Sequence, residues 1–226
     1  MTINRTYNLA NPVGSHIVQV CQNKTSQVEA IAHYIKDGLL NDEAVVVFAG
    51  AVLRKAVISK MDALGLDMQA FKNKDQIQFF DAEFLLSAFL IDGALEEKVF
   101  QESIGFPIQA AQLQYGKVRA IGGMMDVLWK KGQYDTAMQL EDLWNNLSQK
   151  QEFSLLCSYS LDSLDTNAYD ESLEWILRCH KHLIPVKNYD LSESAADETM
   201  LDVFEAAWNR VVGRLSGIHN SAQMPY

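Results

Sequence analysis

The chain has 226 residues, the size of one ordinary α/β domain, and 48% of them are hydrophobic, which is enough apolar material for a full core. Its formal net charge of −10 repels phosphate backbones and anionic lipids, so we expect no nucleic-acid or membrane partner. The N-terminus lacks a signal-peptide pattern, and no apolar run approaches the ~20 residues that span a bilayer. Three cysteines without metal-type spacing favour a reducing compartment. A cytoplasmic protein is therefore expected.

Six apolar runs predict the strands of a mostly parallel sheet. In chain order they are His16–Cys21, Ala44–Ala49, Ile77–Phe80, Lys117–Ile121, Phe153–Tyr159 and Leu183–Val186. The last run contains Pro185, which cannot donate to a strand ladder and therefore indicates the edge of the sheet.

Helical patterns separate these runs, with apolar residues three and four positions apart. They cover Val28–Leu39, Val52–Leu64 (ended by Gly65), Glu83–Ile91, Glu96–Tyr115 (interrupted near Gly105 and Pro107), Met124–Trp129, Ala137–Leu147 and Glu171–His180. Strands that alternate with helices predict a three-layer α/β sandwich around a parallel sheet.

Three regions divide the chain. Residues 1–14 have no periodicity and are expected to form an N-terminal arm, residues 15–190 the α/β domain, and residues 191–226 an amphipathic helix and tail. The helix, about Ala195–Leu215, carries an apolar seam of only about two heptads. It either docks on its own domain or pairs with a second copy in a homodimer.

The first strand and helix stand where a phosphate-binding loop would lie in a nucleotide-binding domain of this type. Such a loop needs glycines so that backbone amides can surround the phosphates. Lys24 and Thr25 preserve a Lys-Thr pair, but the turn before them contains no glycine. We therefore interpret it as an ordinary turn or the remnant of a phosphate loop, and we expect no nucleotide cofactor.

Neither a metal site nor a catalytic site is predicted. His180 and His182 are two residues apart and would point to different faces of a helix, whereas zinc needs three or four converging ligands. The chain has no G-x-S-x-G motif and no Ser-His-Asp order. No residue is therefore assigned a catalytic role.

A ligand site is expected at the carboxyl edge of the sheet, where open α/β sheets bind their ligands. Gly122 and Gly123 allow a sharp turn there, and the side chains of Met124, Trp129 and Tyr159 are apolar and adaptable. These side chains either pack in the core or line a pocket for a small, partly apolar molecule. Glu141 is either a solvated or capping residue, or a polar anchor for that molecule.

Several blocks of the chain resemble the MEDS family, the methanogen/methylotroph sensory domain. His16-Ile-Val-Gln-Val is similar to the family's H-x-V-Q-F strand. Gly122–Trp129, Leu140–Asn145 and Phe153–Tyr159 are similar to its G-E-M-x-x-L-W, L-E-x-L-W-N and F-x-L-L-C-x-Y blocks, and Cys179–Tyr189 to its C-x-x-H-x-x-I-P-x-x-Y ending. Phe80-Asp81-Ala82, followed by Asp92-Gly93, is similar to its D-A…D-G segment.

The resemblance implies a RecA/KaiC-like fold without a functional phosphate loop and a sensory role. Hydrocarbon-like ligands have been proposed for the family, and a histidine kinase or another signalling protein would act as the partner in trans. One departure is that Gly123 replaces the glutamate of the family's G-E-M block.

Our first hypothesis is therefore a stand-alone, non-catalytic sensory module. The residues expected to contact its ligand are Cys21, Asp81, Met124, Trp129, Glu141 and Tyr159. Two alternatives stay open: a RecA/KaiC-like nucleotide-binding protein or ATPase, and an interaction scaffold that binds no ligand.

Overall fold

The computed structural model describes residues 16–21, 23–160 and 182–184. Its six-stranded sheet has the order β3-β2-β6-β7-β1-β8, and every neighbouring pair is parallel. The strands are β1 (His16–Cys21), β2 (Ala44–Ala49), β3 (Ile77–Asp81), β6 (Val118–Gly122), β7 (Ser154–Ser160) and β8 (His182–Ile184). The six strands predicted from apolar runs are thus confirmed, and β8 lies at the predicted edge.

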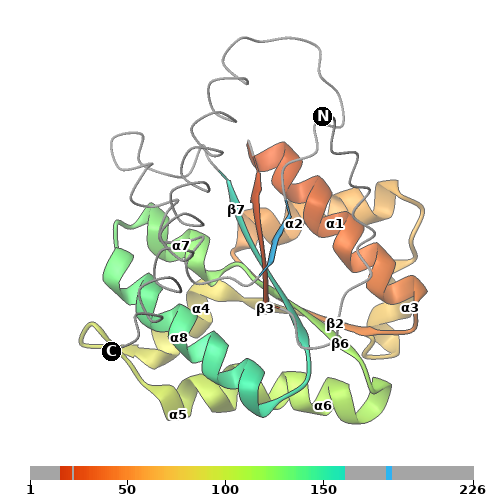
Figure 1. Cartoon of the computed structure of the whole chain (residues 1–226). Helices are drawn as coiled ribbons and strands as arrows, with labels where there is room; N and C mark the ends of the chain where they lie inside the picture. The colour runs from red at the N-terminus through yellow and green to blue at the C-terminus, as the bar shows by residue number, and fades with distance from the viewer. Residues whose placement is uncertain (1–15, 22, 161–181, 185–226) are drawn as a thin grey trace, which may run out of the picture.

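Helices cover both faces of the sheet (Figure 1). One face carries α1 (Lys24–Leu40), α2 (Ala51–Ala63) and α3 (Met68–Asn73). The other carries α4 (Ala82–Phe89), α5 (Glu97–Phe100), the π-helical turn η1 (Gln101–Gly105), α6 (Phe106–Tyr115), α7 (Met124–Lys130) and α8 (Tyr134–Lys150). The expected three-layer α/β sandwich is therefore confirmed.

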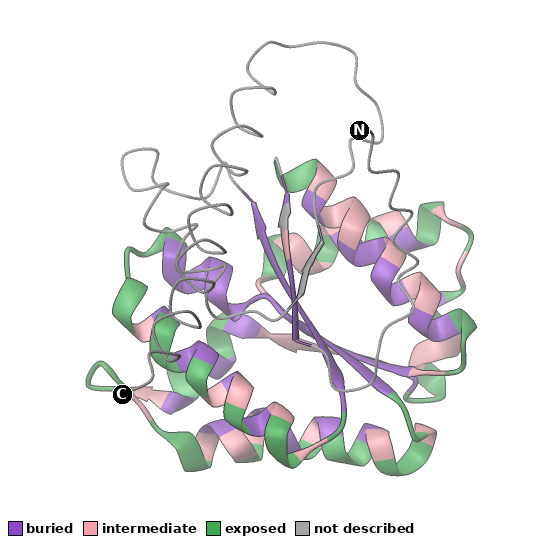
Figure 2. Cartoon of the chain, in the orientation of Figure 1, coloured by how far each residue is buried: buried purple, intermediate pink, exposed green. Residues whose placement is uncertain are grey.

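Each face of the sheet has its own apolar core, because side chains alternate along a strand. In β2, Val46 and Phe48 pack toward α4–α8, while Val45 and Val47 pack toward α1–α3. Strands β2, β6 and β7 are accordingly buried along their whole length (Figure 2). Continuous β-branched runs are typical of such doubly covered parallel strands.

One helix prediction is wrong at its end. The helix expected over Glu83–Ile91 stops at Phe89, and the chain forms a short antiparallel hairpin, β4 (Leu90–Ile91) and β5 (Ala94–Leu95). Asp92 and Gly93 join its strands with φ of 52° and 82°. Both residue types favour such turns, so the turn chemistry overrides the helical period.

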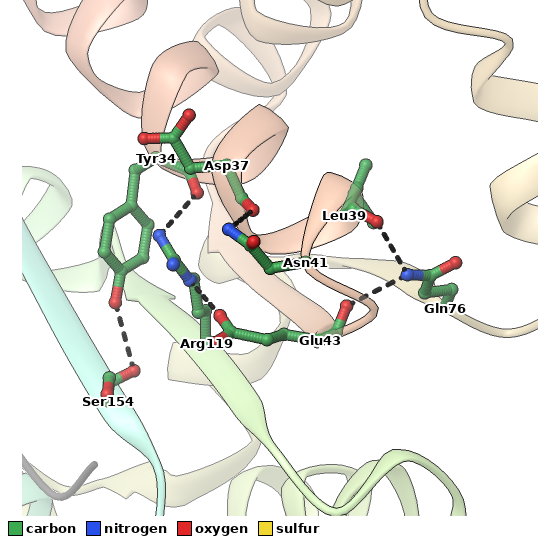
Figure 3. A network of polar contacts seen from close by, with 8 residues as sticks. All are labelled: Tyr34, Asp37, Leu39, Asn41, Glu43, Gln76, Arg119 and Ser154. Carbon is green, nitrogen blue, oxygen red and sulfur yellow. Dashed lines mark hydrogen bonds and ion pairs between the residues drawn. The ribbon is translucent and has the colours of Figure 1, made fainter. Parts of the chain in front are cut away.

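A buried polar group fixes α1 against the sheet, and we call it the Arg119 network (Figure 3). From β6, the Arg119 guanidinium forms an ion pair with Glu43, donates to the Tyr34 carbonyl at 3.2 Å and lies 4.8 Å from the centre of the Tyr34 ring. The Gln76 amide donates to the Leu39 and Glu43 carbonyls at 3.1 and 3.2 Å. The network therefore links α1, β6 and the segments that precede β2 and β3.

Some predictions fall outside the described residues: the N-terminal arm, the helix over Glu171–His180 and the terminal helix. Within the described ranges, no helix has both the length and the apolar character needed to cross a bilayer.

Candidate functional site

Five polar side chains meet between the sheet and α8, and we call them the His16 cluster. They come from β1 (His16), β7 (Cys157, Tyr159) and α8 (Glu141, Asn145). The ring nitrogen Nδ1 of His16 lies 2.9 Å from Asn145 Oδ1. Its Nε2 lies 3.2 Å from Cys157 Sγ and 3.4 Å from Glu141 Oε2. The Tyr159 hydroxyl donates to Glu141 Oε1 at 2.9 Å.

Strand pairing and helix period bring these residues together. Because β1 and β7 are neighbouring parallel strands and side chains alternate along each strand, the side chains of His16, Cys157 and Tyr159 reach the same face. Glu141 and Asn145 lie one turn apart on α8. His16, Glu141, Cys157 and Tyr159 are all buried. The cluster is therefore shielded from bulk water by the apolar core of that face.

Burial controls the charge of the cluster. It raises the pKa of Glu141, while the charge of His16 and hydrogen bonds with Tyr159 and Cys157 act in the opposite direction. A carboxylate without compensation is costly in such a place. Any negative charge on Glu141 therefore depends on its neighbours His16, Tyr159 and Cys157.

Trp144, one turn from Glu141 on α8, adds a buried donor to this region. Among the described residues, its indole Nε1 has no hydrogen-bond acceptor. The rings of Phe48 and Phe100 lie 5.6 and 5.5 Å away, centre to centre. A buried N–H without an acceptor is costly. A bound molecule that offered an acceptor would therefore gain affinity at Trp144.

Gly122 ends β6 beside Trp144 and the His16 cluster. A Cβ atom at this position would lie 3.3 Å from Cys157 Sγ and 3.7 Å from Trp144 Cε2. The glycine therefore allows the thiol and the indole to approach the carboxyl end of β6.

Four of the predicted ligand-site residues lie on this face of the sheet. Glu141 and Tyr159 are in direct contact. Met124 and Trp129 of α7 belong with Tyr159 to one buried apolar core. The ring of Trp129 also packs on Tyr134, with centres 4.6 Å apart.

The other two predicted residues, Cys21 and Asp81, lie elsewhere. Cys21 points to the opposite face of β1, where its thiol lies 3.8 Å from Ser158 Oγ and burial raises its pKa to about 11. Asp81 caps α4 at the end of β3 and pairs with Arg54 at 3.1 Å. The hydrogen bond from the Phe84 backbone N–H is the main reason that the pKa of Asp81 is lowered, with Arg54 contributing. The structure thus does not bring these two residues to Tyr159.

His16, Asn145 and Cys157 were not among the predicted site residues. The signal was present nonetheless, because they belong to the blocks that resemble the MEDS family, as do Glu141 and Tyr159. The polar members of three separate blocks meet in one cluster. Strand order made this hard to foresee, because β1 pairs with β7 across most of the described chain.

The backbone at Gly123 leaves little room for a side chain. Its N–H donates to the Phe48 carbonyl at 2.7 Å, and a Cβ atom would lie only 2.8 Å from the same oxygen. The glutamate found here in the resembling block would require β2 and β6 to move apart at their ends.

The position of a phosphate loop is occupied by a short connection. Strand β1 ends at Cys21 and α1 begins at Lys24, so only residues 22 and 23 lie between them. Asn23 caps the helix: its side chain accepts from the Ser26 N–H at 3.0 Å, and Ser26 Oγ accepts from the Asn23 N–H at 3.1 Å. The helix terminus thus has its own capping box.

Comparison with solved structures places this fold in a known class. The flagellar accessory protein FlaH from Methanocaldococcus jannaschii is similar, with a TM-score of 0.53 at 12% sequence identity, over 81% of this chain and 75% of FlaH. The chain therefore has a RecA/KaiC-like α/β fold.

Comparison with protein families identifies the domain itself. The sequence model described as "MEDS: MEthanogen/methylotroph, DcmR Sensory domain" matches residues 15–181. The chain belongs to the MEDS family, which confirms the resemblance seen in its motifs. A search among curated proteins found no match.

Proposed function

We propose that this chain is a sensory input domain that binds a small, partly apolar molecule between the carboxyl end of β6 and α8. The family, which is named for a sensory domain, supports the sensory role. The main support for the proposed ligand site is the buried indole N–H of Trp144, which has no acceptor among the described residues.

The surroundings of Trp144 define the chemistry of the proposed ligand. Aromatic rings supply apolar contact at Trp144, and Met124 belongs to the same apolar core. Glu141 and Tyr159 offer polar anchors. A molecule of a few carbon atoms with one weak acceptor, such as an ether, a ketone or a haloalkane, would satisfy the indole and still be compatible with the apolar walls.

The output is proposed to lie in a partner protein, because a sensory domain acts by changing another activity. A histidine kinase or another cytoplasmic signalling protein, acting in trans, fits the family's sensory role. Homodimerisation through residues 191–226 stays a prediction, since that segment lies outside the described residues.

We further propose that the chain neither binds nor hydrolyses nucleotides. A two-residue connection between β1 and α1 is too short to surround a triphosphate, and Asn23 and Ser26 already cap the helix. The nearby Lys24 would have to hold phosphates without the backbone amides on which such loops depend.

A thermal-shift screen of the full chain tests the ligand proposal. The probes are one- to four-carbon ethers, ketones, thioethers and haloalkanes, with Mg·ATP as a separate arm. At least one small molecule is expected to raise the Tm, because a ligand that binds the native state stabilises it. Trp144→Phe should abolish that shift. Tyr34→Phe, which removes a buried hydroxyl on the opposite face, should preserve it.

Two outcomes would reject the proposal. A screen in which no small molecule raises the Tm would contradict the proposed ligand site. Stabilisation by Mg·ATP would favour the nucleotide-binding alternative.

A further inference from the structure

The His16 cluster contains three atoms that can ligate a metal: His16 Nε2, Cys157 Sγ and a carboxylate oxygen of Glu141. They lie within 4.8 Å of one another, and all three residues are buried. No local spacing of histidines and cysteines indicates this site, because the three residues lie far apart in the chain. These three ligands instead come from β1, α8 and β7.

We infer that His16, Glu141 and Cys157 form a binding site for one divalent transition-metal ion of the Zn²⁺ type. The inference does not depend on the proposed sensory role. It rests on the ligand set, its spacing, and the outer hydrogen bonds that hold it.

The spacing fits tetrahedral coordination. Zinc lies about 2.0–2.1 Å from histidine nitrogen, about 2.0–2.2 Å from carboxylate oxygen and about 2.3 Å from thiolate sulfur. At tetrahedral angles, such ligand atoms stand about 3.3–3.6 Å apart. His16 Nε2 lies 3.4 Å from Glu141 Oε2 and 3.2 Å from Cys157 Sγ. Both distances from His16 are therefore close to those of a tetrahedral site, and the carboxylate and the thiol, within 4.8 Å of each other, would close on the ion.

The outer contacts are those expected around metal ligands. A ligating histidine usually donates its other ring N–H to an oxygen, which fixes its tautomer and orientation. Asn145 Oδ1 lies 2.9 Å from Nδ1 of His16 and can play this role, leaving Nε2 for the metal. The second oxygen of Glu141 is held by the Tyr159 hydroxyl at 2.9 Å.

Charge balance also favours an ion. Binding replaces the thiol proton of Cys157, which leaves to solvent, with a bond from sulfur to metal. The carboxylate and thiolate together carry two negative charges, and a divalent ion compensates both in a place where an unpaired charge is costly.

The ligand types select among metals. Sulfur and imidazole nitrogen suit Zn²⁺, Co²⁺ and copper, whereas Mg²⁺ and Ca²⁺ prefer oxygen ligands. A fourth position would be taken by solvent or by a small molecule.

The test uses the full chain, freed of metal with a chelator and titrated with Co²⁺ as a spectroscopic probe. We expect one ion per chain, with a near-ultraviolet charge-transfer band that reports bonding between sulfur and cobalt. Zn²⁺ should displace the Co²⁺ and raise the Tm. Elemental analysis of the untreated protein should find a transition metal.

Matched variants locate the ligands. Cys157→Ser should remove the charge-transfer band, whereas Cys21→Ser, a buried thiol on the opposite face, and Cys179→Ser should keep it. His16→Gln and Glu141→Gln should each lower Co²⁺ affinity more than tenfold. Asn145→Ala, a positioning change, should lower it about 10–100-fold while keeping the sulfur band. Circular dichroism of each variant confirms that it is folded.

Two results would overturn the inference. One is a folded wild-type chain that shows neither bound metal nor a sulfur-to-cobalt band. The other is a band that survives Cys157→Ser and disappears in another cysteine variant. Either result leaves the ligand screen at Trp144 unaffected, because that screen is also run on chelator-treated protein.

Discussion

The two faces of the sheet each bury a polar group, and the two groups are built differently. On the α1 face, the Arg119 network combines one guanidinium with one carboxylate, and the guanidinium also donates to the Tyr34 carbonyl. On the α8 face, the His16 cluster combines a carboxyl, a thiol, an imidazole and a phenol. The Arg119 network pairs opposite charges, as is expected of a structural brace.

The comparison shows that burial alone does not distinguish a structural group from a functional one. Arg119 and Glu141 are both almost inaccessible. What differs is chemistry: Arg119 meets an opposite charge, whereas burial opposes ionisation of Glu141 and its neighbours include soft metal ligands. Substitutions on the two faces should therefore differ in their effects on stability.

Replacing Arg119, the cation of the Arg119 network, should have the largest effect on stability. Arg119→Met leaves the half-buried Glu43 without its partner, and we expect a loss of about 3 kcal/mol in the free energy of unfolding, the low end of the cost of breaking a buried ion pair. Urea denaturation measures it. Replacing both residues, as in Arg119→Met with Glu43→Leu, should cost less than the single change. A single variant as stable as wild type would show that the network is not a brace.

Neutralising one carboxyl on each face should distinguish the two faces. Glu43→Gln should cost about 1.5–3 kcal/mol, because a charged hydrogen bond is lost. In chelator-treated protein, Glu141→Gln should change stability by less than about 1 kcal/mol, since a neutral amide suits that site and its oxygen can still accept from Tyr159. Equal losses of unfolding free energy at both positions, measured by urea denaturation, would show that the two carboxyls play the same structural role.

The carboxyl edge between the faces is predicted to be rigid at Gly123. Gly123→Ala places a Cβ atom 2.8 Å from the Phe48 carbonyl, and we expect destabilisation of about 1–3 kcal/mol by thermal unfolding. Gly50→Ala is the control, because its Cβ atom would meet nothing closer than 3.8 Å. Similar Tm values for both variants would show that the edge adapts freely.

The thiol on the α1 face should make the smallest contribution. Burial raises the pKa of Cys21 from 9.0 to about 11, so between these values the unfolded chain loses the thiol proton while the native chain keeps it. The stabilisation by Cys21 is complete below pH 9 and declines as the pH rises toward 11. Cys21→Ser should therefore flatten the fall of stability with pH, and an unchanged slope would contradict the assignment.

Most of the fold could be predicted from the sequence because each strand is a continuous apolar run between turn residues. The hairpin at Asp92 and Gly93 was missed although an Asp-Gly pair signals such a turn, because the apolar period of α4 continues through Leu90 and Ile91. Tyr159 was predicted from its place near a strand end, and Glu141 from its place beside Trp144 on a helix. His16 and Cys157 were not, because their contact depends on which strands are neighbours, and no local pattern encodes that order.

Helix α8 carries Glu141, Trp144 and Asn145 on consecutive turns. Because a helix moves as a rigid element, a ligand that displaces any one of these side chains shifts the other two as well. Ligand binding in the interior would thus displace the C-terminal end of α8, where Lys150 forms an ion pair with Glu97 at 3.6 Å. Helix α8 could in this way couple ligand binding in the interior to a change at the molecular surface.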